Sequence, residues 1–318
     1  MPDNLLGGRY VITELLGEGG IGVVYKAEDL QENCEVAIKF MIQEAAVEIK
    51  TQQIRQRYFA REIAILSKIR HPGIVSLYDS GFTEIGLPYF VMEYIVGKTL
   101  LDILKDGPLL LGRAFNLLQQ IGSALDCIHQ HNAIHRDLKP ENIMIVTKNG
   151  KEIAKLLDFG IAKILEDAQS GSPFMPITQA GHILGTVDYL SPEQWQDKPL
   201  DSRADIYAFG LIAYEMLTGY HPFRGGFSIG DTMMRHLEEE PLPPSSFDPE
   251  IPLLLDQVIL RSLAKDRNHR YSSAIEFLTD FEEVLAEIYR RSVSYLSNPA
   301  TETLMYEIVE IPDEEERD

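Results

Sequence analysis

A chain of 318 residues is long enough for two domains or for one large two-lobed domain. Hydrophobic residues make up 45% of it and charged residues 25%, which is ordinary for a globular protein with a substantial core. Its 29 basic residues are outnumbered by 49 acidic ones, and the net charge of −20 argues against nucleic acid and anionic membrane as partners.

Targeting and redox signals are weak in this chain. Two cysteines, Cys34 and Cys127, give neither a disulfide framework nor a zinc spacing, so we expect reduced thiols in a cytoplasmic protein. The first residues show no basic segment followed by an apolar stretch, so no signal peptide is expected. The longest apolar run, residues 204–219, is too short for a bilayer and contains Asp205 and Glu215, which predicts a buried helix and no membrane span.

The first part of the chain has the pattern of strands. Short segments rich in β-branched residues, separated by Gly, Asp or Asn, predict strands at residues 9–17, 22–30, 34–42, 74–82 and 88–95. Between the third and the fourth, apolar residues spaced by three or four predict a helix over residues 52–69.

The rest of the chain is mainly helical in pattern. An apolar stripe predicts a helix over residues 111–131, and a last helix over residues 273–291 has Ser273 and Glu276 in the positions of a capping box. Between them, residues 143–157 predict a hairpin, because their central Asn-Gly pair suits the primed turn of a two-residue hairpin loop.

These segments predict an α+β fold with a small β-rich lobe, a connector at residues 93–97 and a larger helical lobe. A cleft between two such lobes is the expected ligand site. The acidic, aromatic-poor end of the chain, which finishes in EIPDEEERD, is expected to be disordered.

The segment GEGGIGVVYKA places Gly17, Gly19 and Gly22 in a G-x-G-x-x-G pattern. Glycines allow backbone N–H groups to approach phosphates without obstruction, although a glycine-rich turn without a ligand explains the pattern equally well. A dinucleotide-binding fold would continue into a helix, whereas a second strand follows these glycines. The pattern therefore favours a hairpin lying over phosphates.

Lys39 stands in the apolar strand segment VAIK. An ordinary lysine at a strand edge is one interpretation. A lysine between apolar neighbours usually requires an anion, and Glu62 on the predicted helix is the candidate. Such a pair would hold the lysine against nucleotide phosphates.

The segment HRDLKPEN is followed 16 residues later by DFG. Together they supply oxygen-bearing side chains at Asp137, Asn142 and Asp158, which suit Mg²⁺ shared with phosphate oxygens. Asp137 would accept or orient a hydroxyl proton, and Lys139 would neutralise a phosphoryl group in transfer. The spacing, the glycines and Lys39 together favour this interpretation over a charged surface loop.

These motifs, in this order, resemble a eukaryotic-type (Hanks-type) protein Ser/Thr kinase. GEGGIG, VAIK, HRDLKPEN, DFG and GTVDYLSPE follow the order of that family, and segments such as YLSPEQ are most similar to its bacterial branch. The resemblance covers residues 10–288. It implies a bilobal kinase fold with an arm at residues 1–9, a small lobe at 10–92, a hinge at 93–97, a large lobe at 98–288 and an acidic tail at 289–318.

The resemblance also implies an activity and its groups. The enzyme would transfer the γ-phosphate of ATP to Ser or Thr hydroxyls of protein substrates, using Mg²⁺. The residues implied in catalysis are the base Asp137, with Lys139, Lys39 and Glu62. Those implied in Mg²⁺ binding are Asn142 and Asp158. Those implied in ATP binding are Gly17, Gly19, Gly22, Val24, Ala37, Lys39, Glu93, Ile95 and Met144.

Further roles follow from the same resemblance. Within the large lobe, Glu193 would pair with Arg270, and Asp205 would hold the backbone of the catalytic loop. Arg136 would receive a phosphorylated residue of the activation loop, for which Thr178 is the implied site. Autophosphorylation of this kind implies a transient homodimer. An unmodified loop that contains a threonine is the alternative.

Two other functions remain open at this point. A pseudokinase keeps the fold as a binding scaffold, but usually lacks one of Lys39, Asp137 or Asp158, and this chain has all three. A small-molecule kinase of related fold is less consistent with the intact GTVDYLSPE segment, which builds the peptide platform in protein kinases.

Overall fold

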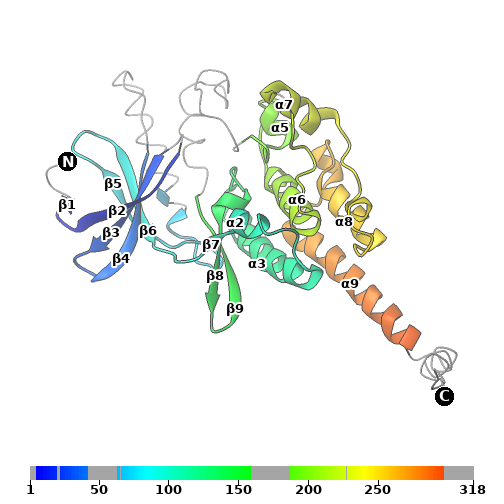
Figure 1. Cartoon of the computed structure of the whole chain (residues 1–318). Helices are drawn as coiled ribbons and strands as arrows, with labels where there is room; N and C mark the ends of the chain where they lie inside the picture. Colours follow the sequence, from blue (N-terminus) through cyan, green and yellow to red (C-terminus); the bar gives the residue numbers. More distant parts are fainter. Residues whose placement is uncertain are drawn as a thin grey trace, which may run out of the picture.

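The computed structural model describes residues 5–19, 22–41, 63–64, 66–158, 187–226 and 228–296, with side chains through residue 291. A β-sheet lobe and a helical lobe lie side by side, and the last helix leads away from the helical lobe (Figure 1). The α+β class and the two lobes expected from the sequence are confirmed. Most of the predicted helix at residues 52–69 lies outside the described ranges; its last described helical residue is Leu66.

The small lobe is built on one antiparallel sheet. Its described strands are β1 (Leu5–Leu6), β2 (Tyr10–Gly19), β3 (Gly22–Asp29), β4 (Cys34–Met41), β5 (Leu77–Phe82) and β6 (Pro88–Glu93). They pair in the order β1-β2-β3-β4-β6-β5. These strands match the five sequence-predicted segments, and the short β1 adds an edge that the sequence pattern did not indicate.

Strand β4 is buried on both faces, and this places Lys39. Val36, Ile38 and Phe40 point to one side, where they pack in a cluster confined to the small lobe. Because side chains alternate along a strand, Lys39 shares the other side with Ala37, which belongs to the core that continues into the large lobe. The sheet therefore directs this lysine toward the junction of the lobes.

The large lobe is mostly helical. Its elements are β7 (Lys98–Thr99), α2 (Leu100–Leu104), α3 (Leu111–Gln130), η1 (Pro140–Asn142), β8 (Ile143–Lys148), β9 (Lys151–Leu156), α5 (Pro192–Trp195), α6 (Arg203–Thr218), α7 (Ile229–Glu238), η2 (Pro244–Ser246), α8 (Leu253–Ser262), η3 (Arg267–His269) and α9 (Ala274–Leu296). Helix α6 is buried along nearly its whole length, as its apolar sequence predicts. None of the helices in the described ranges has the length and apolar character needed to cross a bilayer.

The hairpin of β8 and β9 turns at Asn149 and Gly150. Both residues have positive φ, +53° and +73°, as the primed turn requires. Segment 73–76 runs beside β9: the N–H of Val75 donates to the carbonyl of Leu156 at 3.0 Å, and the N–H of Leu156 donates to that of Gly73 at 2.8 Å. These bonds fix the end of β9 against the chain that leads into the small lobe.

The predicted capping box of the last helix forms only in part. The backbone N–H of Glu276 donates to the hydroxyl of Ser273 at 3.1 Å. The carboxylate of Glu276 instead accepts from Ser272 at 2.8 Å and pairs with Arg261 at 2.5 Å, so it does not return to the N–H of the cap. The predicted capping box is wrong in this respect, because a cation from α8 competes for the glutamate.

Two buried histidines lie beneath the segment that enters α5. Burial lowers the pKa of His236 to about 3, and the charge of Lys265 acts in the same direction. Burial also lowers the pKa of His221 well below its usual value. The ring of His236 bonds the hydroxyl of Tyr207 at 3.0 Å, and the two imidazoles lie 6.0 Å apart. Both rings are therefore neutral in the folded chain.

These histidines predict a loss of stability in acid. The unfolded chain binds protons at their positions below about pH 6.5 and the folded chain does not, so the free energy of unfolding should fall as the pH decreases from there. His236→Asn keeps a polar group toward Tyr207 and removes one such site. Between pH 6.5 and 5.5, urea unfolding should show a loss about 1 kcal/mol smaller in the variant than in the wild type. Equal losses in the two proteins would contradict the neutral buried state of His236.

Candidate active site

The catalytic-loop backbone is fixed by the carboxylate of Asp205, in the first turn of α6. Asp205 is 2% exposed and accepts hydrogen bonds from the backbone N–H groups of His135 and Arg136, at 2.7 and 2.9 Å. Burial by itself would raise the pKa of Asp205, but the bond from His129 at 2.7 Å and the nearby His135 lower it overall. The ionised carboxylate thus holds two consecutive amides, as the family resemblance implies.

Arg136 adopts a strained backbone conformation that is held from both sides. Its φ of +65° lies in the left-handed region, which costs about 1–3 kcal/mol for a residue with a Cβ. Its N–H is bound by Asp205, and its carbonyl accepts a hydrogen bond from the side chain of Gln194 at 3.0 Å. These two contacts fix the direction in which the chain enters Asp137.

The side chains of Asp137, Lys139 and Asn142 form one buried group. The amide nitrogen of Asn142 donates to Oδ2 of Asp137 at 2.9 Å and to its backbone oxygen at 2.8 Å. The Nζ of Lys139 lies 3.1 Å from the same Oδ2. Asp137 and Asn142 are only 8% and 7% exposed, so the carboxylate is oriented beside a cation in low-dielectric surroundings. Such a carboxylate can accept a proton from a bound hydroxyl group.

Asp158 follows β9 and meets Lys39 across the junction of the lobes. Its Oδ2 lies 2.7 Å from the Nζ of Lys39, and both side chains are at least three-quarters buried. The φ of Asp158 is +39°, a second strained position at this site. The ring nitrogen Nε2 of His135 bonds the carbonyl of the preceding Leu157 at 3.0 Å, which ties the catalytic loop to Asp158.

The groups present fit a hard divalent cation. Oδ1 of Asp158 is buried and has no hydrogen-bond partner among the described residues. Because the amide nitrogen of Asn142 is engaged by Asp137, its side-chain oxygen would be the atom available to a cation. Mg²⁺ prefers such oxygen ligands and usually takes the others from phosphate and water. No cluster of three or more His, Cys, Asp or Glu side chains suited to a metal occurs in the described ranges.

The glycines at the adjoining ends of β2 and β3 differ in whether packing requires them. A Cβ on Gly22 would lie 2.4 Å from the carbonyl oxygen of Phe40, so packing alone demands glycine there. A Cβ on Gly17 or Gly19 would meet no atom within 4 Å. Packing within the described chain therefore does not explain these two glycines, whereas close approach of a phosphate to the backbone would.

The remaining residues implied in ATP binding come from both lobes. Val24 on β3 lies opposite Lys39 in the sheet, and Ala37 on β4 lies opposite Met92. Met144 lies on β8 in the large lobe, and Glu93 ends β6 at the connector. The structure places these positions on the elements that border the junction of the lobes.

Two sequence-predicted residues cannot be placed. Glu62 and Thr178 lie outside the described ranges. The Lys39–Glu62 pair and the modification of Thr178 therefore stay predictions. In the described part of the chain, the partner of Lys39 is Asp158.

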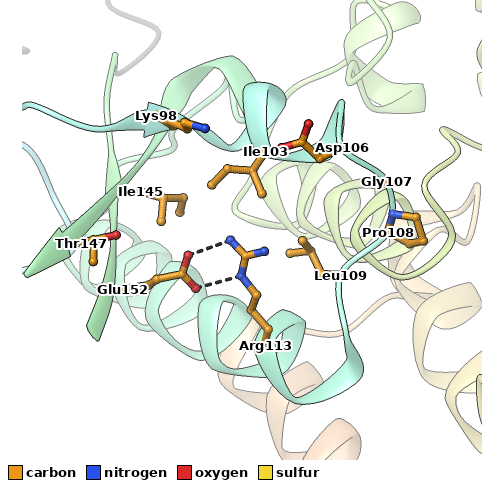
Figure 2. A pocket seen from close by; sticks show the side chains of 10 residues that line it. All are labelled: Lys98, Ile103, Asp106, Gly107, Pro108, Leu109, Arg113, Ile145, Thr147 and Glu152. Atoms are coloured by element: carbon orange, nitrogen blue, oxygen red, sulfur yellow. Dashed lines mark hydrogen bonds and ion pairs between the residues drawn. The ribbon is translucent and has the colours of Figure 1, made fainter. Parts of the chain in front are cut away.

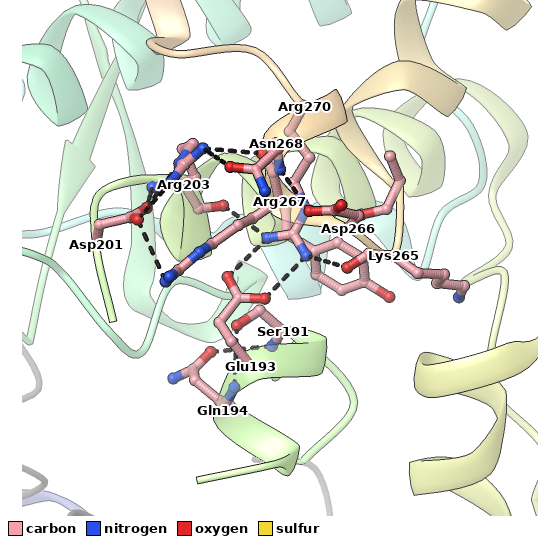
Figure 3. A network of polar contacts seen from close by, with 12 residues as sticks. Ser191, Glu193, Gln194, Asp201, Arg203, Lys265, Asp266, Arg267, Asn268 and Arg270 are labelled. Atoms are coloured by element: carbon pink, nitrogen blue, oxygen red, sulfur yellow. Dashed lines mark hydrogen bonds and ion pairs between the residues drawn. The ribbon is translucent and has the colours of Figure 1, made fainter. Parts of the chain in front are cut away.

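A buried ion pair supports the segment that carries Gln194 (Figure 3). The guanidinium of Arg270 donates to both carboxylate oxygens of Glu193, at 2.7 and 2.9 Å. Both side chains are nearly inaccessible, and the guanidinium also donates to backbone carbonyls of Arg203, Ala264 and Lys265. Removing one partner of a buried pair typically costs about 3–5 kcal/mol, so the pair expected from the resemblance is a strong structural constraint.

Sequence reasoning missed three supporting residues. His129 donates to Asp205, Gln194 donates to Arg136, and Lys155 pairs with Glu93 at 2.7 Å. None has a sequence signal of its own. His129 stands in a helix that reads only as an apolar stripe, and Lys155 stands in a hairpin strand.

Residues 10–289 match the family model described as "Protein kinase domain". The chain belongs to the protein kinase family. It is 39% identical over 284 residues to a probable serine/threonine-protein kinase of Streptomyces coelicolor. It is 39% and 38% identical, each over 283 residues, to serine/threonine-protein kinase PknB of Mycolicibacterium smegmatis and of Mycobacterium tuberculosis.

These alignments each cover 88% of the chain but only 40–43% of the relatives. The protein therefore spans about two fifths of the length of these curated kinases. The expected Hanks-type family, its bacterial branch and the bilobal fold are confirmed. Protein kinases use ATP together with a divalent metal ion.

Proposed function

We propose that this chain is an active protein Ser/Thr kinase that transfers the γ-phosphate of ATP to hydroxyl groups of protein substrates. The observation that carries the proposal is the ion pair between Lys39 and Asp158. It accompanies the contacts of Lys139 and Asn142 with the carboxylate of Asp137. Phosphoryl transfer needs positioning and charge compensation at one point, and these residues supply both.

The proposed chemistry follows from the positions of the protein groups. Asp137 orients the substrate hydroxyl and accepts its proton as the oxygen forms a bond to the γ-phosphorus. The bond from that phosphorus to the β–γ bridging oxygen breaks, and ADP leaves. Lys139, 3.1 Å from Asp137, compensates negative charge on the phosphoryl group in transfer.

The nucleotide would lie across the junction of the lobes. Lys39 and the glycine loop would hold its phosphates, and Val24, Ala37 and Met144 would enclose the adenine beside the hinge backbone at Glu93 and Ile95. Asn142 and Asp158 would hold Mg²⁺, which would neutralise negative charge on the phosphates.

We further propose that the chain phosphorylates itself at Thr178, in a transient homodimer. Arg136 directly precedes Asp137, and its backbone is already fixed by Asp205 and Gln194. A phosphate brings nearly two negative charges and strong acceptor oxygens, which would accept hydrogen bonds from the guanidinium of Arg136.

Incubation with ATP and Mg²⁺, followed by mass spectrometry of the chain, tests this proposal. The wild type should acquire phosphate on Thr178, and the Asp137→Asn variant should not. The Thr178→Ala variant should phosphorylate peptide substrates more slowly than the wild type. A wild type that puts phosphate neither on its own Ser and Thr residues nor on those of a peptide library would contradict the proposed activity. Phosphate elsewhere but not on Thr178 would contradict only the regulatory part.

A further inference from the structure

The hinge between the lobes has no hydrogen bonds of its own within the described part of the chain. Residues 94–96 connect β6 to β7, and neither their N–H nor their carbonyl groups pair with another described residue. Tyr94 and Ile95 pack against the hydrophobic core through their side chains, so the backbone of this segment is held by that packing and by the residues on either side, Glu93 and Gly97. Both of these contact the β8–β9 hairpin of the large lobe.

At the first end, Glu93 is held by Lys155 on β9. The Nζ of Lys155 lies 2.8 and 2.7 Å from the two carboxylate oxygens, and the side chains are 18% and 26% exposed. The backbone N–H of Ser76 also donates to this carboxylate at 3.3 Å, and the N–H of Glu93 donates back to the carbonyl of Ser76 at 2.9 Å. The end of β6 is thus tied to β9, in the strand that leads to Asp158.

At the other end, Gly97 lies directly against β8. A Cβ at this position would be 2.5 Å from the carbonyl oxygen of Ile145 and 3.4 Å from the Cε of Met144. The first of these atoms is backbone and cannot move aside, so only glycine allows this approach. In the hairpin, Lys155 is the cross-strand partner of Met144. Both ends of the hinge are therefore fixed close to the same methionine.

We infer that Lys155 is a positioning residue for nucleotide binding. Through Glu93, and together with the close packing of Gly97, it sets the distance between the hinge backbone at Ile95 and the side chain of Met144. That distance sets where the hinge backbone at the edge of the proposed adenine site lies relative to Met144, which would form one wall of the site. The inference rests on the proposed function, because it takes residues 93–95 as the adenine-binding segment. Lys155 itself need not touch the nucleotide.

The test is a titration of the folded full chain with ATP and, separately, with adenosine, which has the base but no phosphates. In Lys155→Met, the affinity for both ligands should fall by the same factor, about fivefold to tenfold, with little change in kcat. In Lys39→Met, only the affinity for ATP should fall. The charge-swapped double variant Lys155→Glu/Glu93→Lys should recover much of the affinity for adenosine, because the ion pair is restored in reverse.

Glu152, which lies on β9 together with Lys155, provides a control. Glu152 pairs with Arg113 through two bonds of 2.7 and 2.9 Å, at a pocket of about 380 Å³ that none of the proposed site residues lines (Figure 2). Glu152→Gln disrupts an ion pair of similar geometry that includes neither Lys155 nor Glu93, and should leave adenosine affinity unchanged.

Three outcomes would overturn the inference. These are unchanged adenosine affinity in Lys155→Met, an equal loss in Glu152→Gln, or a wild type that binds no adenosine. A fourth possible result is a wild type that binds adenosine more tightly than Lys155→Met does and yet transfers no phosphate. That result would support the inference and overturn only the proposed kinase activity.

Discussion

Lys39→Met and Asp158→Ala should each reduce phosphoryl transfer to less than about a thousandth of the wild-type rate while the chain stays folded. The two side chains form a 2.7 Å ion pair across the junction of the lobes. In the proposed mechanism, one of them holds phosphate oxygens and the other holds Mg²⁺. Loss of either removes charge compensation that is needed in the transition state. The measurement is transfer from radiolabelled ATP, with thermal melting as the check on folding.

A matched ion pair serves as the control for this prediction. Lys105 lies 2.7 Å from Asp102 on the surface of the large lobe, so Lys105→Met removes a lysine–aspartate contact of the same length without affecting the site. In thermal melting, the double variant of Lys39 and Asp158 should be less destabilised than the sum of the singles, because each single change leaves a largely buried charge unpaired. Transfer near the wild-type rate in either folded single variant would contradict the assignment.

Asp137→Asn should lower kcat by at least about 10²-fold and leave ATP affinity nearly unchanged. The variant keeps the size of the side chain and an oxygen that can face the amide of Asn142, so the loop should retain its geometry. What it loses is the carboxylate that accepts the hydroxyl proton, and this loss acts in the transition state. Steady-state kinetics and ATP titration separate the two effects.

The control for this variant is Asp126→Asn. Asp126 lies on α3, where its carboxylate accepts a hydrogen bond from Gln130 on the same helix. That change should alter neither kcat nor ATP affinity. If Asp137→Asn weakens ATP binding and leaves kcat intact, Asp137 is not the base.

The site residues that sequence predicts best are those in continuous motifs. Asp137, Lys139 and Asn142 lie within six residues, so local chain geometry brings them together, and the structure places their side chains in contact. The β8–β9 hairpin follows in the same way from its Asn-Gly turn. Long-range contacts such as Glu193–Arg270 could be expected only because the whole motif set resembles a known family.

Contacts made by isolated residues could not be predicted. His129, Gln194 and Lys155 each support the site from an element whose sequence shows only its secondary structure. Their partners are chosen by tertiary packing, which brings together residues that are far apart in the chain. Glu276 shows the converse. The capping-box rule predicts that its carboxylate binds the backbone N–H of Ser273, but the carboxylate pairs with Arg261 on another helix. Local rules fail where a distant charge offers a stronger contact.

The central claim is that the chain moves phosphate from ATP to Ser and Thr hydroxyls with the help of Mg²⁺. Its most direct test is the amount of labelled γ-phosphate recovered on Ser, Thr and Tyr of a mixed peptide library, with Mg²⁺ and with Mg²⁺ removed by a chelator. The account predicts label on Ser and Thr, little on Tyr, and loss of label without Mg²⁺. Label that is absent from Ser and Thr, or equally abundant after Mg²⁺ removal, would contradict it.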